Sequence, residues 1–468
     1  MKKIKIICSI GPASCDVSVM SEMVRSGMSV ARINFSHATD KEKELVVDTV
    51  KKVRKETGCP IGILYDTKGP EFRNGMLEND SISLVDGETI RVVKDEVLGN
   101  SSRFSVNHPA ALDCLSIGDE ILLENGLMKI IVESKEEDGV TCRIINGGVL
   151  GNKKSLSVPG VRLDIPFVSD DDYRDIVYAC NHDGDFLALS FVSDKSDVLR
   201  VREILKEQNR SDMKIISKIE STTGIDNIRE IVSVSDGVMV ARGDLGVEAP
   251  LAELPFLQKL IIEECHKQGK FSIVATEMLE SMKKNSRPTR AEVSDIANAV
   301  LNGADCVMLS GETTTGKYPS LTVSYMADIC EMAEAHIDVK VDVDCASKTI
   351  GGAIASSVLE SANLLDAKVI VAATMSGLSA RRISNLRPKS PILAACPSSD
   401  TARGLMLNWG VYPVVTDVYS STDEIVSDAK KKASDFVSLS KGDIIVITGG
   451  FPNNTEIKST NFMKIEQI

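Results

Sequence analysis

The sequence lacks the paired cysteines that would indicate a disulfide framework or a zinc site. Its 11 cysteines, an odd number, stand singly between Cys8 and Cys396, and none forms a C-x-x-C pair. Disulfide-rich secreted domains and zinc sites both use cysteines in pairs at characteristic spacings. We therefore expect free, buried thiols in a protein of the reducing cytoplasm.

Long apolar runs and an excess of basic residues are also missing. No apolar run approaches the roughly 18 residues that a membrane span needs, and the run within MKKIKIICSIGPAS is too short for a signal peptide. Lys and Arg number 54 against 67 Asp and Glu, which gives a formal net charge of −13. Neither nucleic acid nor a membrane is an expected partner, because the overall field repels anions. An anionic ligand must be held by local positive charge.

The chain does contain a repeated unit of strand and helix. It has 468 residues, 43% of them hydrophobic, which is enough for two or three domains. Helical stretches such as VSVMSEMVRSG and DDDYRDIVYACNH separate most of its short β-branched runs. Alternating strands and helices indicate a parallel sheet, and eight such units fit a closed (β/α)₈ barrel. The runs are IKIICS, SVARINFSH, IGILYDTKGP, DFLALSFVS, KIISKIES, GVMVARGDLG, FSIVATEM and CVMLSGET.

Two parts of the chain depart from this unit. Residues 72–158 show alternating strand patterns punctuated by Gly, Asn and Asp, which predicts a small inserted β domain with VPGV as its return hinge. After the linker DVKVDVDCASKT the pattern is that of an open α/β domain. We predict a TIM barrel in two parts (residues 1–70 and 159–340), an inserted β-barrel cap (71–158) and a C-terminal α/β domain (341–468).

Charged residues follow two adjacent predicted strands, where a barrel places its chemistry. Glu220 ends IISKIES and Asp244 follows the next strand, so their carboxylates should meet. Two hard oxygen ligands with open positions suit Mg²⁺. Ion pairs with Lys218 or Arg242 are the alternative. Lys218 shares a strand face with Glu220, where it could form a Schiff base, stabilise an anion or make only a salt bridge.

A second polar group follows the second and third strands. ARINFSH carries polar side chains at alternate positions, and YDTKGP adds a carboxylate and a hydroxyl. Such mixed oxygens suit a monovalent cation, whereas Arg32 and Arg73 could bind phosphate by bidentate contacts. Turn and helix capping is the alternative, since the same residue types serve there. The candidate cation ligands are Asn34, Ser36, Asp66 and Thr67.

A third candidate is a loop in the C-terminal part. TMSGLSARRI follows a predicted strand and opens a helix. Backbone amides and hydroxyl groups at a helix N-terminus can hold a phosphate, although a simple helix cap is the alternative. The residues concerned are Thr374, Ser376, Gly377 and Ser379.

Together these stretches resemble the pyruvate kinase family over essentially the whole chain. The resemblance implies the predicted fold and transfer of a phosphoryl group from phosphoenolpyruvate to ADP, which gives pyruvate and ATP in the last step of glycolysis. It also implies Mg²⁺ or Mn²⁺, K⁺, a homotetramer, and regulation by a sugar phosphate or AMP. The matching stretches are RINFSH, DTKGPEFRNG, IISKIES, ARGDLGVE, ATEMLESM, RPTRAEVSDIANAV and MLSGETTTGKYP.

The resemblance assigns catalytic and metal-binding roles. Glu220 and Asp244 would hold the divalent metal, while Lys218 would balance charge on the phosphoryl group and the enolate. Thr276 would lie near the methylene carbon that is protonated. The implied catalytic residues are Lys218, Arg32 and Thr276, and the implied substrate-binding residues are Arg32, Gly243, Asp244 and Thr276.

The resemblance also assigns the remaining ligand sites. Glu71 stands where potassium-independent relatives carry Lys, which favours a K⁺ site formed by the candidate cation ligands named above. The TMSGLSARRI loop would bind the effector. The implied nucleotide-binding residues are Asn34, His37, Arg73 and Lys154.

Some positions depart from the family's pattern, and two other functions remain open. The cap segments KKSLSVPG and LENGLM are altered, which leaves the nucleotide contacts of the cap open. A metal-dependent aldolase or lyase acting on pyruvate enolate would share the barrel and Mg²⁺, but the cap argues against it. A non-catalytic sensor of phosphorylated metabolites would have lost Lys218 or the metal carboxylates, which this chain keeps. The other departures are Thr223, Glu277 and Ser193.

Overall fold

Eight parallel strands at the centre of the molecule close into a barrel. The computed structural model describes residues 1–36, 38–337, 348–450 and 460–468. Each predicted run forms one barrel strand, and the order around the barrel follows the order along the chain. The predicted TIM barrel is therefore confirmed. The strands are β1 (Lys5–Ser9), β2 (Met28–Asn34), β3 (Gly62–Asp66), β12 (Phe186–Leu189), β13 (Lys214–Ile219), β14 (Gly237–Ala241), β15 (Phe271–Ala275) and β16 (Cys306–Leu309).

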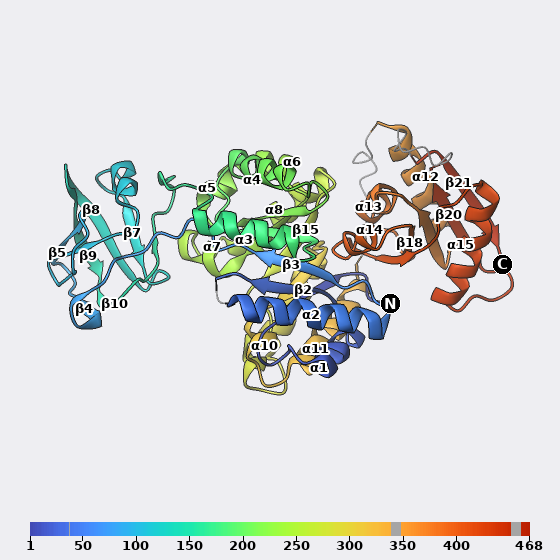
Figure 1. The fold of residues 1–468 in the computed structure, drawn as a ribbon, viewed down its shortest axis with the longest axis horizontal. Helices are drawn as coiled ribbons and strands as arrows, with labels where there is room; N and C mark the ends of the chain where they lie inside the picture. Colours follow the sequence, from blue (N-terminus) through green and yellow to red (C-terminus); the bar gives the residue numbers. More distant parts are fainter. Residues whose placement is uncertain (37, 338–347, 451–459) are drawn as a thin grey trace.

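Amphipathic helices cover the outside of the barrel (Figure 1). Helix α2, for example, begins with a capping box between Thr39 and Glu42 and ends at Gly58, whose φ of 70° suits glycine. No helix in the described residues is both long and apolar enough to cross a membrane. The helices are α1 (Val17–Arg25), α2 (Asp40–Thr57), α3 (Asp170–Asn181), α4 (Lys195–Glu207), α5 (Thr222–Asp226), α6 (Ile228–Val234), α7 (Arg242–Glu248), α8 (Leu254–Lys267), α9 (Arg290–Leu301), α10 (Gly311–Thr314) and α11 (Pro319–Glu334), with a 3₁₀ turn η3 (Glu280–Lys283).

Alternate side chains of the strands fill the inside of the barrel. Phe186, Ile216 and Met239 belong to one fully buried interior cluster. Because strand side chains alternate between faces, Lys218 and Glu220 continue the inward face of Ile216 toward the carboxyl end of β13. The inward face therefore changes from apolar to charged at the barrel mouth.

Between β3 and β12 the chain forms the predicted β domain, the cap. Its strands form a six-stranded and a two-stranded sheet around one apolar core, and no hydrogen-bonded strand pair in the described residues joins the two sheets into a ring. The cap lies at one end of an elongated molecule (Figure 1). Its elements are η1 (Glu78–Asp80), β4 (Ser81–Leu84), β5 (Thr89–Val93), β6 (Arg103–Ser105), η2 (Pro109–Cys114), β7 (Glu120–Leu123), β8 (Met128–Glu136), β9 (Gly139–Asn146), β10 (Gly148–Gly151) and β11 (Leu156–Ser157).

The C-terminal domain is an open sheet with helices on both faces, as predicted. Its strand order is β19-β18-β17-β20-β21, and β21 alone runs antiparallel to its neighbour. The sequence did not predict β21. Residues 338–347, which include most of the expected linker, lie outside the described residues. The elements are α12 (Ile350–Leu364), β17 (Val369–Ala373), α13 (Leu378–Asn385), β18 (Ile392–Cys396), α14 (Ser399–Arg403), β19 (Val411–Val415), α15 (Thr422–Phe436), β20 (Ile444–Gly449) and β21 (Phe462–Gln467).

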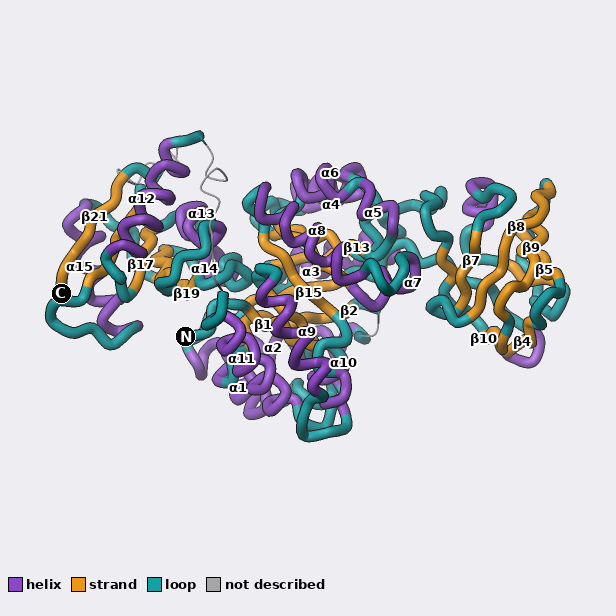
Figure 2. The backbone as a smooth tube through the Cα atoms, turned by 180° about the vertical axis from the view of Figure 1, so that it is seen from behind, coloured by secondary structure: helices purple, strands orange, loops and turns teal. Residues whose placement is uncertain are grey.

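The C-terminal domain packs against the amino ends of the barrel strands, opposite the cap (Figure 2). Leu407 belongs to the barrel-interior cluster, and its carbonyl oxygen accepts a hydrogen bond from Cys306 Sγ at 3.1 Å. Arg403 lies 2.8 Å from Asp185, the residue before β12. We call this contact region the barrel floor.

A largely buried arginine, whose side chain is 10% exposed, contributes to the barrel floor. Arg387 donates to Nε2 of His266 at 2.5 Å and to the carbonyl oxygen of Gly303 at 2.8 Å, and it lies 3.0 Å from Asp305. Burial and the positive charge of Arg387 lower the pKa of His266 to about 4. The ring can accept this hydrogen bond only while Nε2 carries no proton.

Acid should therefore weaken the barrel floor. The pKa of His266 in the folded protein lies below the ordinary histidine value of 6.5. The stability that the neutral ring contributes to the folded state is therefore present above pH 6.5 and is lost as the pH falls toward 4. We expect the melting temperature to fall between pH 7 and pH 5, and to fall less in His266→Gln, as measured by calorimetry. His336→Gln changes a histidine whose Nδ1 contacts the carbonyl oxygen of Met332, and it should keep the wild-type loss. Equal acid sensitivity in His266→Gln and wild type would contradict this account.

Candidate active site

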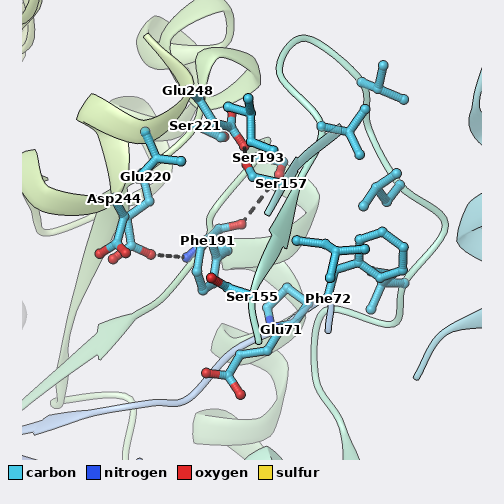
Figure 3. A pocket seen from close by; sticks show the side chains of 18 of the residues that line it. Glu71, Phe72, Ser155, Ser157, Phe191, Ser193, Glu220, Ser221, Asp244 and Glu248 are labelled. Atoms are coloured by element: carbon cyan, nitrogen blue, oxygen red, sulfur yellow. Dashed lines mark hydrogen bonds between the residues drawn. The ribbon is translucent and has the colours of Figure 1, made fainter. Parts of the chain in front are cut away.

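A cavity of about 430 Å³ lies between the cap and the carboxyl ends of the barrel strands. Residues 70–73 after β3, residues 154–158 of the cap, and the segments after β12, β13 and β14 form its walls (Figure 3). A (β/α)₈ barrel carries its chemistry at this end of the strands. The cavity therefore lies at the end of the barrel where the strand-end pattern placed the candidate residues.

A buried carboxylate ties the side chains of four neighbouring strands together. One oxygen of Asp66 accepts from Arg32 Nε at 2.7 Å, and the other from Lys218 Nζ at 3.1 Å. Lys218 also donates to Ser190 Oγ at 2.7 Å and lies 3.0 Å from Glu220. The structure thus brings together residues that are distant in sequence.

The charges in this network support one another. Burial would raise the pKa of Asp66, but Lys218 and Arg32 hold it below its usual value. Burial would lower the pKa of Lys218, but Asp66 and Glu220 raise it above its usual value. Both side chains stay charged, so Lys218 presents a fixed positive charge at the barrel mouth.

Glu220 and Asp244 place two carboxylates beside this charge. Glu220 is 2% exposed, and its Oε2 accepts from the backbone N–H of Phe191 at 2.6 Å. Burial, opposed by Lys218 and assisted by the Asp244 carboxylate, raises the pKa of Glu220 to about 7. Asp244 is exposed in the first turn of α7, and no described residue donates a hydrogen bond to its carboxylate. Figure 3 shows the two carboxylates side by side.

This pair fits a hard cation that keeps water or substrate oxygens. Mg²⁺ usually takes only one or two carboxylates from the protein. Within the described ranges, no group of three or more His, Cys, Asp and Glu is arranged to hold a metal. Of the two alternative ion pairs, Glu220 does pair with Lys218, whereas Arg242 pairs with Asp295 at 2.6 Å rather than with Asp244.

The cavity walls carry six carboxylates and only three cations. Arg73 lies 2.6 Å from Glu71, and Lys154 lies 2.6 Å from Glu124. An anionic ligand is therefore repelled unless cations enter with it or these ion pairs open. The acidic residues are Glu71, Glu124, Asp197, Glu220, Asp244 and Glu248, and the basic residues are Arg73, Lys154 and Arg162.

The candidate ligands of a monovalent cation lie at the same strand ends. Asn34 faces Asp66 across the β2–β3 pair, and Thr67 follows Asp66 directly. The Asn34 Oδ1 atom accepts from the backbone N–H of exposed Ser36 at 3.0 Å. His37, the other predicted residue of this segment, lies outside the described residues.

Thr276 and Gly243 meet across the ends of β15 and β14. The backbone N–H of Gly243 donates to Thr276 Oγ1 at 2.9 Å, and this hydroxyl donates to the carbonyl oxygen of Ala275 at 2.6 Å. The two residues are therefore close enough to act on one ligand. In this arrangement the backbone N–H of Gly243 already has an acceptor, the Thr276 hydroxyl.

The predicted effector loop lies in the C-terminal domain, on the other side of the barrel from the cavity. Gly377 has a φ of 80° and precedes α13, and no side chain among the described residues caps this helix. Ser376 is exposed, and Thr374 is buried at the end of β17. The Ser379 hydroxyl lies 2.5 Å from that of Thr460, a contact that the sequence did not suggest.

Sequence reasoning missed two polar residues of the candidate site, Ser190 beside Lys218 and Glu248 in the cavity wall. Ser190 ends the run DFLALS, so the strand-end rule that selected Glu220 could have found it. No comparable signal marks Glu248. Its Oε1 accepts from Ser157 of the cap at 2.5 Å, and its Oε2 accepts from the Thr222 N–H at 3.0 Å. Glu248 therefore links the cap to the loop that follows Glu220.

Comparison with known proteins covers both the barrel and the C-terminal domain. Residues 1–323 match the family model for the pyruvate kinase barrel domain, and residues 352–466 match that for the pyruvate kinase alpha/beta domain. Pyruvate kinase of Staphylococcus haemolyticus is 44% identical over 474 residues, which is 100% of this chain and 81% of that protein. Pyruvate kinase of Staphylococcus aureus is 44% identical over 476 residues, with the same coverage. A solved pyruvate kinase from Cryptosporidium parvum superposes with a TM-score of 0.95 at 38% identity, over 100% of this chain and 96% of that one.

Proposed function

Because this chain belongs to the pyruvate kinase family, we propose that it transfers the phosphoryl group of phosphoenolpyruvate to ADP with a divalent metal ion held by Glu220 and Asp244. The chain is a phosphotransferase of the pyruvate kinase type, which sets the lyase and sensor alternatives aside. The observation that carries the metal proposal is the pair of carboxylates beside Lys218. Mg²⁺ or Mn²⁺ would supply a Lewis acid for phosphoryl and enolate oxygens.

Lys218 and Arg32 hold positive charge where negative charge develops during transfer. Their ion pairs with Asp66, at 3.1 and 2.7 Å, fix both cations before substrate arrives. Such preorganised charge lowers the barrier because the groups need not reorient during the reaction. Thr276 stands near the methylene carbon in this proposal, and the backbone amides of Gly243 and Asp244 bind the substrate carboxylate.

The nucleotide takes the cap side of the cavity in the same proposal. Arg73 and Lys154 line this wall, and each is paired with a carboxylate in the structure. Binding of the ADP phosphates would exchange those carboxylates for phosphate oxygens. Asn34 and His37 are the other proposed nucleotide contacts.

A homotetramer in the cytoplasm is the assembly and compartment that we propose. Phe256 and Leu260 lie one turn apart on α8 and are 73% and 44% exposed, so this helix presents an exposed apolar pair. This exposed apolar surface on α8 supports association with further copies of the same chain. The ten cysteines in the described residues are all free, which suits a reducing compartment.

Lys218→Met should abolish most phosphoryl transfer without preventing folding. Loss of one preorganised charge commonly lowers the rate by about 10²–10³-fold. A coupled assay of pyruvate formation measures this loss, and Mn²⁺ binding by electron paramagnetic resonance should persist. Lys214→Met, at the other end of β13, is the matched control and should stay active. Near wild-type turnover in Lys218→Met would refute the role of this lysine.

Activity should also need K⁺. The oxygens of Asn34, Ser36, Asp66 and Thr67 lie at adjoining strand ends, where a monovalent cation would help to place the phosphoryl group. We expect rates in Na⁺ to be well below those in K⁺, and we expect Glu71→Lys to narrow the difference because an ammonium group replaces the cation.

The exposed cap residue Glu88 supplies the control for this measurement. Glu88→Lys makes the same charge change away from the cavity, so it should keep the wild-type preference for K⁺. Equal wild-type rates in the two salts would count against the potassium proposal.

A phosphorylated metabolite should bind the loop of Thr374, Ser376, Gly377 and Ser379 and raise the affinity for phosphoenolpyruvate. The start of α13, which no side chain of the described residues caps, offers amides and a positive helix end to phosphate. Coupling must be reciprocal, commonly about 5–150-fold. Saturation curves with sugar phosphates and AMP, for wild type and Ser376→Glu, measure it.

The matched control is Ser434→Glu on α15, where the same charge is added to an exposed serine of the same domain. The activator should shift the saturation curve of Ser434→Glu and of wild type, but not that of Ser376→Glu. An activator that shifts all three saturation curves equally binds at a site other than this loop. If neither the sugar phosphates nor AMP shift the wild-type curve, regulation by those ligands is refuted.

A further inference from the structure

The loop that leaves β15 holds two successive residues in the left-handed region of backbone conformation. Thr276 has a φ of 69° and Glu277 a φ of 54°. A β-branched residue is strained at such a φ, and this conformation persists only where the surroundings enforce it. Neither residue is glycine, so something outside the loop must hold it.

Arg242 makes the contacts that hold this loop. Its NH2 group donates to the carbonyl oxygens of Thr276 at 2.6 Å and Glu277 at 3.3 Å. Its NH1 group lies 2.6 Å from Asp295 of α9. The Arg242 side chain is 8% exposed and that of Asp295 is 36% exposed, so it is the bonds to the two carbonyl oxygens that form away from water, where charge-assisted bonds are strong.

The same segment also controls the Thr276 hydroxyl. Arg242 is followed by Gly243, whose N–H donates to Thr276 Oγ1. When a substrate carboxylate takes the Gly243 N–H, the hydroxyl loses this donor and can turn toward the substrate. Arg242 would keep the backbone of Thr276 in place during this exchange, because it binds the carbonyl oxygen of Thr276.

We infer that Arg242 is a positioning residue that keeps the strained Thr276–Glu277 segment in the conformation required for proton transfer to the enolate. This inference rests on the proposed role of Thr276. Arg242 follows β14 and its target follows β15, so one side chain fixes two adjacent walls of the site (Figure 3 shows the neighbouring Asp244).

The experiment compares Arg242→Lys with Arg242→Lys/Glu277→Gly. One ammonium group cannot bind two carbonyl oxygens and Asp295 as a guanidinium does, so turnover should fall by about 10–100-fold. Exchange of the pyruvate methyl protons for deuterium, followed by NMR, should fall by a similar factor, while KM for ADP changes little. Glycine adopts a positive φ without strain, so Glu277→Gly should restore part of both rates.

Arg210→Lys is the matched control. Arg210 donates to the carbonyl oxygens of Cys180 and Gly184 at 2.6 Å each and pairs with Asp212, away from the cavity. This variant should lose thermal stability but keep its turnover. If Arg242→Lys does not fold, Asp295→Asn is the alternative variant, because it weakens only the ion pair between Arg242 and residue 295. This variant should also lower both the turnover and the rate of proton exchange.

Two results would overturn the inference. One is wild-type turnover and proton exchange in folded Arg242→Lys, and the other is a folded double variant that recovers neither rate. Wild-type protein that forms no pyruvate from phosphoenolpyruvate and ADP would instead refute the proposed function, whatever the variants show.

Discussion

The carboxylate of Asp66 is the interaction on which both the barrel mouth and the candidate site depend. It is 1% exposed, and its two oxygens hold Arg32 of β2 and Lys218 of β13. A buried carboxylate without such partners would be strongly destabilising. The pairing also fixes strand register, because a slip by one residue would turn Lys218 outward. The same ion pairs of Asp66 therefore hold the barrel strands together and place positive charge in the site.

The sequence predicted those features of the fold and the site that follow from short local residue patterns. Eight β-branched runs ended in polar residues, and this was sufficient to place Glu220 and Lys218 at one end of a parallel barrel. Strand β21 escaped prediction because Phe462–Gln467 is an edge strand whose residues are all half-exposed or exposed, so no apolar face marks it. The left-handed conformation of Thr276 was equally hidden, since β-branched residues rarely adopt it. The anchor that enforces it, Arg242 with Asp295, joins residues from different elements, which a single sequence does not reveal.

The two accessory domains occupy opposite ends of the barrel. The cap covers the carboxyl ends of the strands, and the C-terminal domain covers the amino ends (Figure 1). Strand β15 runs between them: at the floor the N–H of Ser272 donates to Asp305 at 2.9 Å, and at the mouth the strand leads into Thr276. Asp305 in turn pairs with Arg387 of the C-terminal domain. A displacement of that domain would therefore act on a strand whose other end lies in the site.

The position of Leu407 inside the barrel core bears on how the chain folds during synthesis. Leu309 ends the last barrel strand, but the core of the barrel includes a side chain from the C-terminal domain. A ribosome therefore releases all eight strands before the residue that completes their packing has been made. Until that domain emerges, the amino ends of the strands expose apolar surface, which favours association with chaperones or with other nascent chains. The barrel and the C-terminal domain thus share one apolar cluster although they have separate sheets.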